Sequence, residues 1–294
     1  MRIDVLVTSI VTAAIPLLLA GTGEVVIERA GTINLASEGA MVLAAAFAAV
    51  TAIATDNPWL GLLAGVVAGL IWTLLFALLP IGLKVNQIIA GIALSIAGLG
   101  LSSLVGRGYE GYTLPSMPSL KDVSPILPPL DVLSPILITI PLIVHLFLSR
   151  TRLGLCIRAV GDNPVAADSF GVDVALTRLV AAAIDGILLG LSGAYIVLVA
   201  TQRWVEGVTG GRGWIAVALA PFSYWEPLLV YVGAFLFAGL EVLQYVAQAL
   251  PIRVPRELLL STPYLVLILA LVAVRSQRLQ KRVPRALGTE FKRV

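Results

Sequence analysis

Five polar side chains lie close together near the N-terminus of a strongly apolar chain. They are Glu24, Glu28, Arg29, Asn34 and Glu38. Carboxylate and amide groups can hydrogen-bond to the polar groups of a solute. Their mixed charge also allows these groups to pair with one another and hold a broken helix in place. Two interpretations therefore stay open, a structural ion pair and the lining of a solute pathway.

Further polar residues occur within apolar runs of the second half. Asp185 lies inside a predicted span, where ionisable groups usually face the bundle interior or water. Glu241, Gln244 and Gln248 are spaced i, i+3 and i+7, which places them on one helix face. This stripe would line a pathway or seal against another helix. Arg212 precedes a short apolar segment, where it would meet a soluble binding protein or serve only as a loop charge.

The residues offer little support for an enzyme or a metal site. Residues 190–193 read Gly-Leu-Ser-Gly and fit the G-x-S-G pattern of intramembrane serine proteases. Such a serine needs a general base, and in rhomboid-like proteases that histidine comes later in the chain. The single histidine, His145, precedes Ser192. The lone Cys156 excludes a disulfide framework, and His145 has no nearby cysteine or histidine with which to bind a metal. We therefore predict no catalytic residue and no metal ligand.

Composition identifies the class of protein. The chain is 59% hydrophobic and 13% charged, whereas soluble domains carry about 25% charged residues. Several runs approach the roughly 20 apolar residues that cross a bilayer. These runs are continuous instead of alternating, so helices and not barrel strands are expected. We predict an all-α integral membrane protein, a polytopic bundle formed by residues 1–294 as a single transmembrane domain.

The apolar runs define eight candidate spans, the first of which we interpret as a retained helix and not as a cleaved signal. They are Ile3–Ala20, Ala40–Thr55, Trp59–Ile81, Gln87–Val105, Val132–Leu148, Ala175–Ala200, Leu228–Leu250 and Leu258–Val274. The proline-rich stretch Arg107–Asp131 is expected to be a loop. With short segments that also enter the membrane, the total would be eight to ten.

Charge asymmetry predicts sidedness. The tail Arg275–Val294 is rich in lysine and arginine, as is the stretch that begins at Arg150. Positive charge marks the cytoplasmic side, so both should lie inside, and no nucleic-acid partner is expected for a tail that follows a span. An even number of crossings must separate them, yet only three long spans do. The missing crossing must use Gly213–Ser223. The role of the polar segment Gly23–Gly39 depends on the side of the membrane on which Arg2 lies. The segment belongs to a crossing if Arg2 is cytoplasmic, and it is a cytoplasmic loop if Arg2 is outside.

Glycines recur at helical spacing in two spans. Gly61, Gly65 and Gly69 form one row, and residues 186, 190 and 193 form another. Small residues four apart let membrane helices approach closely. We expect packing within the chain, with a subunit interface as the alternative.

Three tryptophans, Trp204, Trp214 and Trp225, follow or interrupt the apolar runs of the second half. Tryptophan is enriched where a membrane meets water. We predict an aromatic belt at the interface in preference to a stacking site for a base.

A polar stretch interrupts the apolar runs at Gly154–Val174, GLCIRAVGDNPVAADSFGVDV. Asn163 is a suitable N-cap, and Pro164 suits the first position of a helix. Gly171 can supply the left-handed residue that ends it. A short capped helix between two spans suits docking to a soluble partner, although an ordinary interfacial connection fits the residues nearly as well.

This stretch resembles the cytoplasmic coupling segment of ABC-importer permeases in the branched-chain-amino-acid, simple-sugar and nucleoside group. GEVVIERAGTINLASEGAMVLAAA, GILLGLSGAY and GGRGWIAVALAPFSYWEPL resemble other blocks of that group, in the same order. The E-x-x-x-E-R-x-G form from Glu24 and the R-G-W-I-A form from Arg212 indicate the nucleoside and simple-sugar branch. Ala220–Trp225 departs from the usual small residues, which leaves the local backbone and pathway lining there in doubt.

The resemblance implies a permease subunit of an ATP-driven importer in the plasma membrane, which forms the pathway for a nucleoside or a simple sugar. Branched-chain amino acids are the alternative solute, and a secondary transporter, which needs no ATPase partner, is the alternative class. It implies a second permease subunit, identical or paralogous, a cytoplasmic ABC ATPase and an extracytoplasmic binding protein as partners. No G-x-x-x-x-G-K-[ST] loop occurs in the sequence, so ATP would bind the partner ATPase and this chain would carry no cofactor of its own. The residues assigned to ATPase coupling are Gly161, Asp162, Asn163, Pro164, Ala166, Ala167, Asp168 and Gly171. The candidates for the substrate pathway are Glu24, Glu28, Arg29, Asn34, Glu38, Asp185, Arg212, Glu241 and Gln244.

Overall fold

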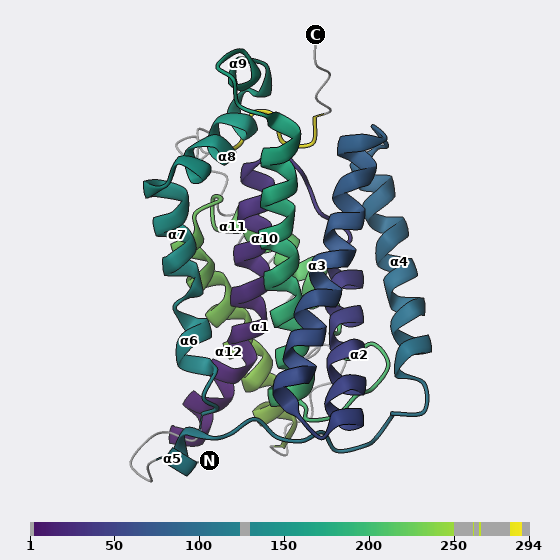
Figure 1. The fold of residues 1–294 in the computed structure, drawn as a ribbon. Helices are drawn as coiled ribbons and strands as arrows, with labels where there is room; N and C mark the ends of the chain where they lie inside the picture. Colours follow the sequence, from purple (N-terminus) through teal and green to yellow (C-terminus); the bar gives the residue numbers. More distant parts are fainter. Residues whose placement is uncertain (1–2, 124–129, 250–260, 262–264, 266–282, 290–294) are drawn as a thin grey trace.

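The continuous apolar runs fold into long helices that lie side by side (Figure 1). The structure is a computed structural model that describes residues 3–123, 130–249, 261, 265 and 283–289. Within these residues six helices are long and apolar enough to cross a membrane, or seven if a bent pair counts as one span. The predicted all-α polytopic class is therefore confirmed. The candidate span Leu258–Val274 lies almost wholly outside the described residues, so the total of eight to ten stays a prediction.

The long helices follow the predicted spans closely. They are α1 (Ile3–Arg29), α2 (Ser37–Thr55), α3 (Pro58–Gly82), α4 (Gln87–Gly106), α10 (Val174–Tyr195) with its π-helical extension η1 (Ile196–Ala200), and α12 (Pro227–Ala249). Asparagine caps begin two of them. The Asn57 side chain accepts hydrogen bonds from the first amides of α3, and Asn86 does the same for α4. Such caps satisfy amides that have no partner within the helix.

The predicted span Val132–Leu148 is built from α6 (Ser134–Ile138) and α7 (Ile140–Arg150). The chain then bends by 78° into α8 (Arg152–Asp162), and α9 (Pro164–Ser169) follows. Figure 1 places α8 and α9 at one end of the bundle, here called the α9 end. The opposite end, near the N-terminus, carries α5 (Leu120–Val123) and is called the α5 end.

The first helix is longer than the sequence predicted. We expected a span that ends at Ala20, but α1 continues without a break to Arg29. The apolar run stops at Ala20 because Gly21–Glu24 is polar, yet these residues stay helical since neighbouring helices bury them. Gly23–Gly39 is thus neither one crossing nor a plain loop. It forms the last turns of α1, a buried irregular segment at 30–36 and the start of α2.

The short apolar segment near residue 213 forms α11 (Arg212–Phe222), a helix of 11 residues. At 1.5 Å per residue it extends for about 16 Å, roughly half of a 30 Å hydrocarbon core. The helix packs against α1, α2 and α12. It enters the bundle and does not cross it alone.

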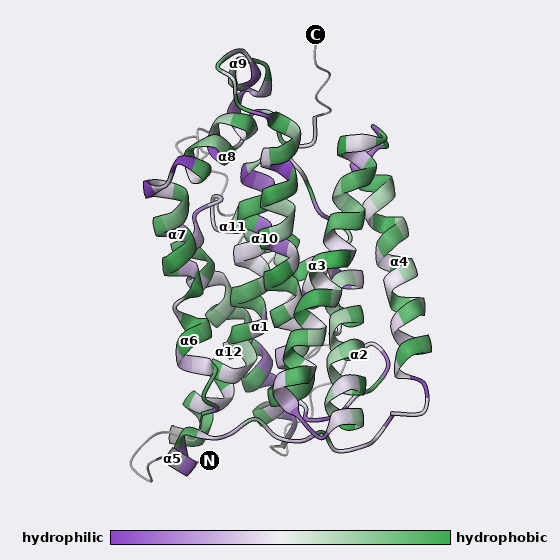
Figure 2. Cartoon of the chain, in the orientation of Figure 1, coloured by the Kyte–Doolittle hydropathy of each residue, from purple (hydrophilic) through white to green (hydrophobic). Residues whose placement is uncertain are grey.

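The glycine rows bring α3 and α10 into direct contact. A Cβ on Gly69 would lie 2.5 Å from the Cα of Gly190, and one on Gly65 would lie 2.8 Å from the Cβ of Ala194. The expected packing within the chain is confirmed. Figure 2 shows hydrophobic residues along the outer faces of the helices and hydrophilic residues mostly at the two ends, with further ones on α1 and α10 toward the α9 end.

Candidate functional site

The polar interruption forms a short, well-capped helix at one end of the bundle. The Asn163 side chain accepts from the amide of Ala166 at 3.0 Å, and Pro164 occupies the first turn of α9. Gly171 has φ of +83°, the left-handed conformation that ends the helix. Each of these features follows the prediction from sequence.

The alanines of α9 do not form its outward surface. Ala167 is buried and packs with Val160 and Val174, and Ala166 is half-buried. The apolar side chains that project into solvent there are Val165, 54% exposed, and Phe170, 90% exposed. Among the other residues assigned to coupling, Asp162 is exposed, Asp168 is half-buried and Gly161 is buried. An exposed apolar surface of this kind suits contact with another protein.

α8 lies directly against the end of α1. A Cβ on Gly161 would lie 1.9 Å from the carbonyl oxygen of Arg29, so no other residue fits there without movement. The segment 283–289 also reaches this point, where the amide of Ala286 donates to the Gly161 carbonyl at 2.8 Å and the amide of Gly288 donates to the Gly31 carbonyl at 3.1 Å. α8, the end of α1, the irregular segment and the segment 283–289 are thus in direct contact.

The first polar cluster is buried and joined by hydrogen bonds. Asn34 Nδ2 donates to Asp185 Oδ2 at 2.8 Å. The Ser37 hydroxyl contacts both Glu24 Oε1 and the Asn34 carbonyl. Asp185, Asn34 and Glu24 are each 0% exposed. These contacts join α1, the irregular segment and α10 at a depth where lipid could not satisfy polar groups.

The irregular segment also finds partners on α4. The amide of Ile33 donates to Gln87 Oε1 at 3.0 Å, and the Ser95 hydroxyl donates to the Leu35 carbonyl at 3.0 Å. Irregular backbone at membrane depth is stable only where protein or water satisfies it. Here α4 and α10 supply the partners, which explains why the segment can stay unwound.

Glu38 caps the start of α11. Its carboxylate accepts from the Thr209 hydroxyl at 2.6 Å, from the amide of Gly211 at 2.9 Å and from the amide of Gly213 at 2.7 Å. A carboxylate is favourable there because the first amides of a helix carry partial positive charge. Glu38 thereby fixes α2 to α11.

Arg212 forms an ion pair with Glu241, which joins α11 to α12. Gln244 is buried, whereas Gln248 is exposed, so the predicted polar stripe divides along its length. The Arg212–Glu241 pair lies on the wall of a cavity of 440 Å³ between α1, η1, α11 and α12. This volume falls within the range of small-molecule sites.

The cavity wall is rich in hydroxyl groups, toward the α5 end of the bundle. Its other polar residues are Thr8, Ser9 and Thr12 of α1, Thr201 after η1, and Tyr245 of α12. Of the predicted pathway residues, only Arg212 and Glu241 line it; the buried cluster of Glu24, Glu28, Asn34, Glu38 and Asp185 does not. The sequence analysis missed the wall of α1 because its pathway candidates were all charged or amide side chains. Three hydroxyls within five residues of an apolar helix were the available signal.

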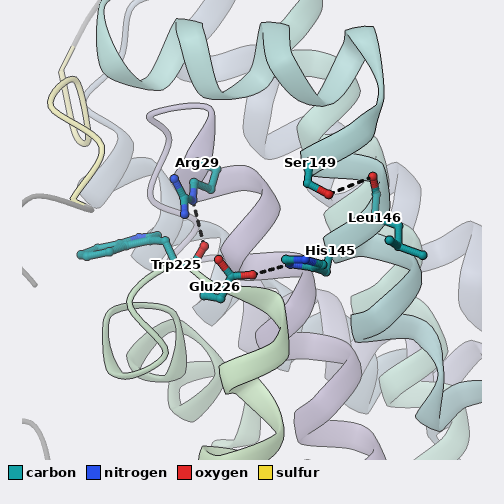
Figure 3. Close-up of polar contacts among 6 residues, drawn as sticks. All are labelled: Arg29, His145, Leu146, Ser149, Trp225 and Glu226. Carbon is teal, nitrogen blue, oxygen red and sulfur yellow. Dashed lines mark hydrogen bonds and ion pairs between the residues drawn. The ribbon is translucent and has the colours of Figure 1, made fainter.

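The turn between α11 and α12 joins three parts of the bundle (Figure 3). Trp225 Nε1 donates to Glu28 Oε2 at 2.5 Å, and Arg29 Nε donates to the Trp225 carbonyl at 2.8 Å. Glu226 Oε1 lies 2.5 Å from His145 Nδ1. Tyr224 and Trp225 both have φ of +53°, a conformation that side chains rarely adopt. Such strain persists where surrounding contacts fix it and is common at functional sites.

The aromatic belt prediction is wrong for two tryptophans. Trp204 is 0% exposed and packs beside Gly106, while Trp225 is 7% exposed and binds Glu28. Only Trp214, at 49%, is exposed. Both misplaced residues follow short polar stretches that resemble interfaces in sequence but fold back into the bundle.

Within the part of the chain that the structure describes, Ser192 forms part of the contact between α10 and α1. It is 0% exposed, and its hydroxyl donates to the carbonyl of Pro16 at 2.7 Å. His145 contacts Glu226 and not Ser192. It also precedes Ser192 in the sequence by more than forty residues. These contacts give the G-x-S-G sequence a role in packing α10 against α1.

A bundle of long apolar helices with a solute-sized cavity and an exposed capped helix at one end is the architecture of a multi-pass membrane transport protein. Residues 6–274 match the family described as "Branched-chain amino acid transport system / permease component". The chain belongs to this family of permeases.

Curated relatives cover nearly the whole chain. It is 35% identical to the putative glucose ABC transporter permease protein TsgC13 of Haloferax volcanii, over 98% of this chain and 97% of the relative. It is 29% identical to the guanosine ABC transporter permease protein NupQ of Bacillus subtilis, over 92% and 91% of the two chains. It is 25% identical to the nucleoside ABC transporter permease protein NupC of Lactococcus lactis subsp. cremoris, over 98% and 97%. No solved structure matches the chain significantly.

Proposed function

We propose that this chain is the membrane-spanning subunit of an ATP-driven ABC importer and carries a nucleoside or a simple sugar across the plasma membrane. The observation that supports this most strongly is α9, a capped helix that presents Val165 and Phe170 at one end of the bundle. The names of the relatives support the solute class, since they include glucose, guanosine and nucleoside permeases. Branched-chain amino acids are the second candidate, because the family description names them.

The α9 end is proposed to face the cytoplasm. Arg150 and Arg152 are exposed at the bend before α8, and positive residues in short loops favour the cytoplasmic side. The N-terminus would then lie outside and the basic C-terminal tail inside. The docking partner at α9 is a separate ABC ATPase, which would bind the ATP, and this chain would need no cofactor of its own.

The remaining partners follow from the same proposal. A second permease subunit, identical or paralogous, would complete the pathway, and an extracytoplasmic binding protein would deliver the solute at the α5 end. Closure of the ATPase would move α9 as a rigid body. The close contact between Gly161 and the Arg29 carbonyl would carry that movement into α1.

The hydroxyl-lined cavity is the proposed place where this chain meets the solute. Threonine, serine and tyrosine hydroxyls donate and accept hydrogen bonds, as do the hydroxyls of a sugar or a ribose. The Arg212–Glu241 pair adds a strong donor and a strong acceptor at the same wall. The same ion pair could also meet the charged ends of a branched-chain amino acid, so competition in uptake is what separates the two solute classes.

Uptake by cells that express the complete transporter tests this proposal. Labelled nucleoside or sugar should accumulate, and an excess of unlabelled branched-chain amino acid should not compete. The Gly171→Pro variant should insert but fail in uptake, because proline cannot adopt φ of +83° and its nitrogen cannot donate to the Asp168 carbonyl. Gly171→Asn is the matched control, since asparagine tolerates this conformation. Normal uptake by Gly171→Pro would refute the coupling role of α9.

A further inference from the structure

A second, smaller cavity lies beneath α8, away from the hydroxyl-lined cavity. Its volume is 80 Å³, well above the roughly 15 Å³ that one water molecule needs. The polar side chains on its wall are Arg29 of α1, His145 and Ser149 of α7, Arg158 of α8, and Glu226 before α12. Figure 3 shows His145 and Ser149 on one helix, with Arg29 and Glu226 across from them.

The wall carries an excess of positive charge. Glu226 is already engaged with His145 at 2.5 Å, and two arginines share the cavity with that pair. Arg158 Nε is buried and has no hydrogen-bond partner within the described part of the chain. A buried guanidinium donor without an acceptor is costly, and an oxyanion is its natural partner.

Ser149 provides a further donor that can turn toward a ligand. Its hydroxyl reaches the Leu146 carbonyl at 3.4 Å, which is long for a hydrogen bond from a hydroxyl. A bound oxygen atom at ordinary distance would compete well with that contact. Arginine forks and a hydroxyl are the donors that proteins use to bind phosphate oxygens.

The position of the cavity favours a lipid as the source of the phosphate. α8 turns by 78° away from the α6–α7 span, and it carries exposed Leu153 and Leu155 beside exposed Arg152. A helix with exposed apolar and basic residues at the end of a span is suited to the interface between headgroups and acyl chains. Basic pockets between helices on the cytoplasmic side are known to hold anionic headgroups.

We propose that the cavity beneath α8 is a binding site for a phosphate oxyanion, presented by the headgroup of an anionic lipid, with Arg158 as its principal ligand. The bound group would join α8 to α1 and α7 through charge-assisted hydrogen bonds. It would thereby stabilise the arrangement that connects α9 to the bundle, whichever solute is transported.

The test uses the complete transporter, purified and stripped of lipid, and measures binding by native mass spectrometry and by the shift in unfolding temperature. Phosphatidylglycerol is the anionic probe, phosphatidylcholine its zwitterionic match and inorganic phosphate the soluble probe. Phosphatidylglycerol should bind the wild type and bind Arg158→Gln about tenfold more weakly, a change of roughly 1.4 kcal/mol. Lys84→Gln, which removes an exposed basic residue outside the cavity and outside α8, should bind within about twofold of the wild type.

The arms of the experiment separate the possible sources. Competition by inorganic phosphate at millimolar concentration would assign the site to a soluble phosphate, and absence of competition would assign it to the lipid. Arg158→Lys keeps the positive charge and should retain part of the binding. This variant distinguishes loss of the charge from misfolding as the cause of weaker binding by Arg158→Gln. Equal binding of phosphatidylglycerol by the wild type, Arg158→Gln and Lys84→Gln would overturn the proposal.

Discussion

At the scale of single residues, several buried carboxylates of α1, α2 and α10 have specific partners. Glu28 accepts from Trp225, Asp185 accepts from Asn34, and Glu38 accepts from the start of α11. Breaking one such contact leaves a buried group unsatisfied, which costs more than the contact itself contributes. The buried polar residues that the sequence singles out in α1 and α2 thus hold irregular backbone in place.

Trp225→Phe should destabilise the protein by about 1–3 kcal/mol, because it removes the N–H that binds Glu28 and leaves a buried carboxyl oxygen without a donor. The midpoint of thermal unfolding in detergent measures the change. Trp214→Phe is the control, since Trp214 is 49% exposed. Equal midpoints for the two variants would show that the contact with Glu28 contributes nothing.

Arg212→Gln should lower uptake by about tenfold, because it leaves Glu241 in the cavity wall without its charged partner; hydrogen bonds to charged groups contribute roughly 1.5–3 kcal/mol. The exchanged pair Arg212→Glu with Glu241→Arg restores opposite charges and should recover part of the uptake. A double-mutant cycle on initial uptake rates gives the coupling between the two residues. A coupling of zero would exclude the ion pair from the transport pathway.

At the scale of elements, composition and local signals predicted the long helices well. Asn57 and Asn86 mark the starts of α3 and α4, and unbroken apolar runs fix their lengths. The end of α1 was missed because Glu28 finds its partner far along the chain: Trp225 lies 197 residues after it. The burial of Trp204 likewise depends on a distant glycine, Gly106, against which it packs. Local patterns cannot reveal such contacts.

The contact between α3 and α10 requires glycine. Gly69→Val should prevent close packing of these helices, because the side chain would overlap the backbone of Gly190. We expect loss of the folded protein from the membrane, measured as monodisperse material in size-exclusion chromatography. Gly82→Val is the matched control on the same helix, with no atom within 4 Å of its added Cβ. Well-folded Gly69→Val protein would contradict the close contact.

At the scale of the whole molecule, the segment 283–289 joins parts of the chain that lie far apart in sequence. Its amides donate hydrogen bonds to the carbonyls of Gly161 and Gly31. The Thr289 carbonyl of the same segment accepts a hydrogen bond from Arg178 Nη1 at 3.4 Å. Arg178 Nε donates to the Ala30 carbonyl at 3.2 Å. The segment therefore connects α8, the irregular segment and α10 at the α9 end.

Ala286→Pro should weaken the coupling between ATP hydrolysis and transport, because proline has no N–H to donate to the Gly161 carbonyl. Loss of one hydrogen bond costs about 0.5–1.5 kcal/mol, so uptake should fall by roughly threefold to tenfold while hydrolysis by the assembled transporter persists. Proteoliposomes allow both rates to be measured together. Ala286→Gly keeps the N–H and should behave as the wild type, and a parallel loss of both rates in Ala286→Pro would argue for misfolding and against a coupling role.

The central claim is that α9 is the element of this permease to which a cytoplasmic ATPase binds. A Phe170→Cys variant, made with Cys156→Ser so that no other thiol is present, allows a membrane-impermeant maleimide to probe this helix directly; Phe170 is 90% exposed. We expect labelling in inside-out vesicles stripped of the ATPase, protection when the ATPase subunit is added back, and none in intact cells. Labelling from the outside of intact cells would place α9 on the wrong side of the membrane and contradict the account.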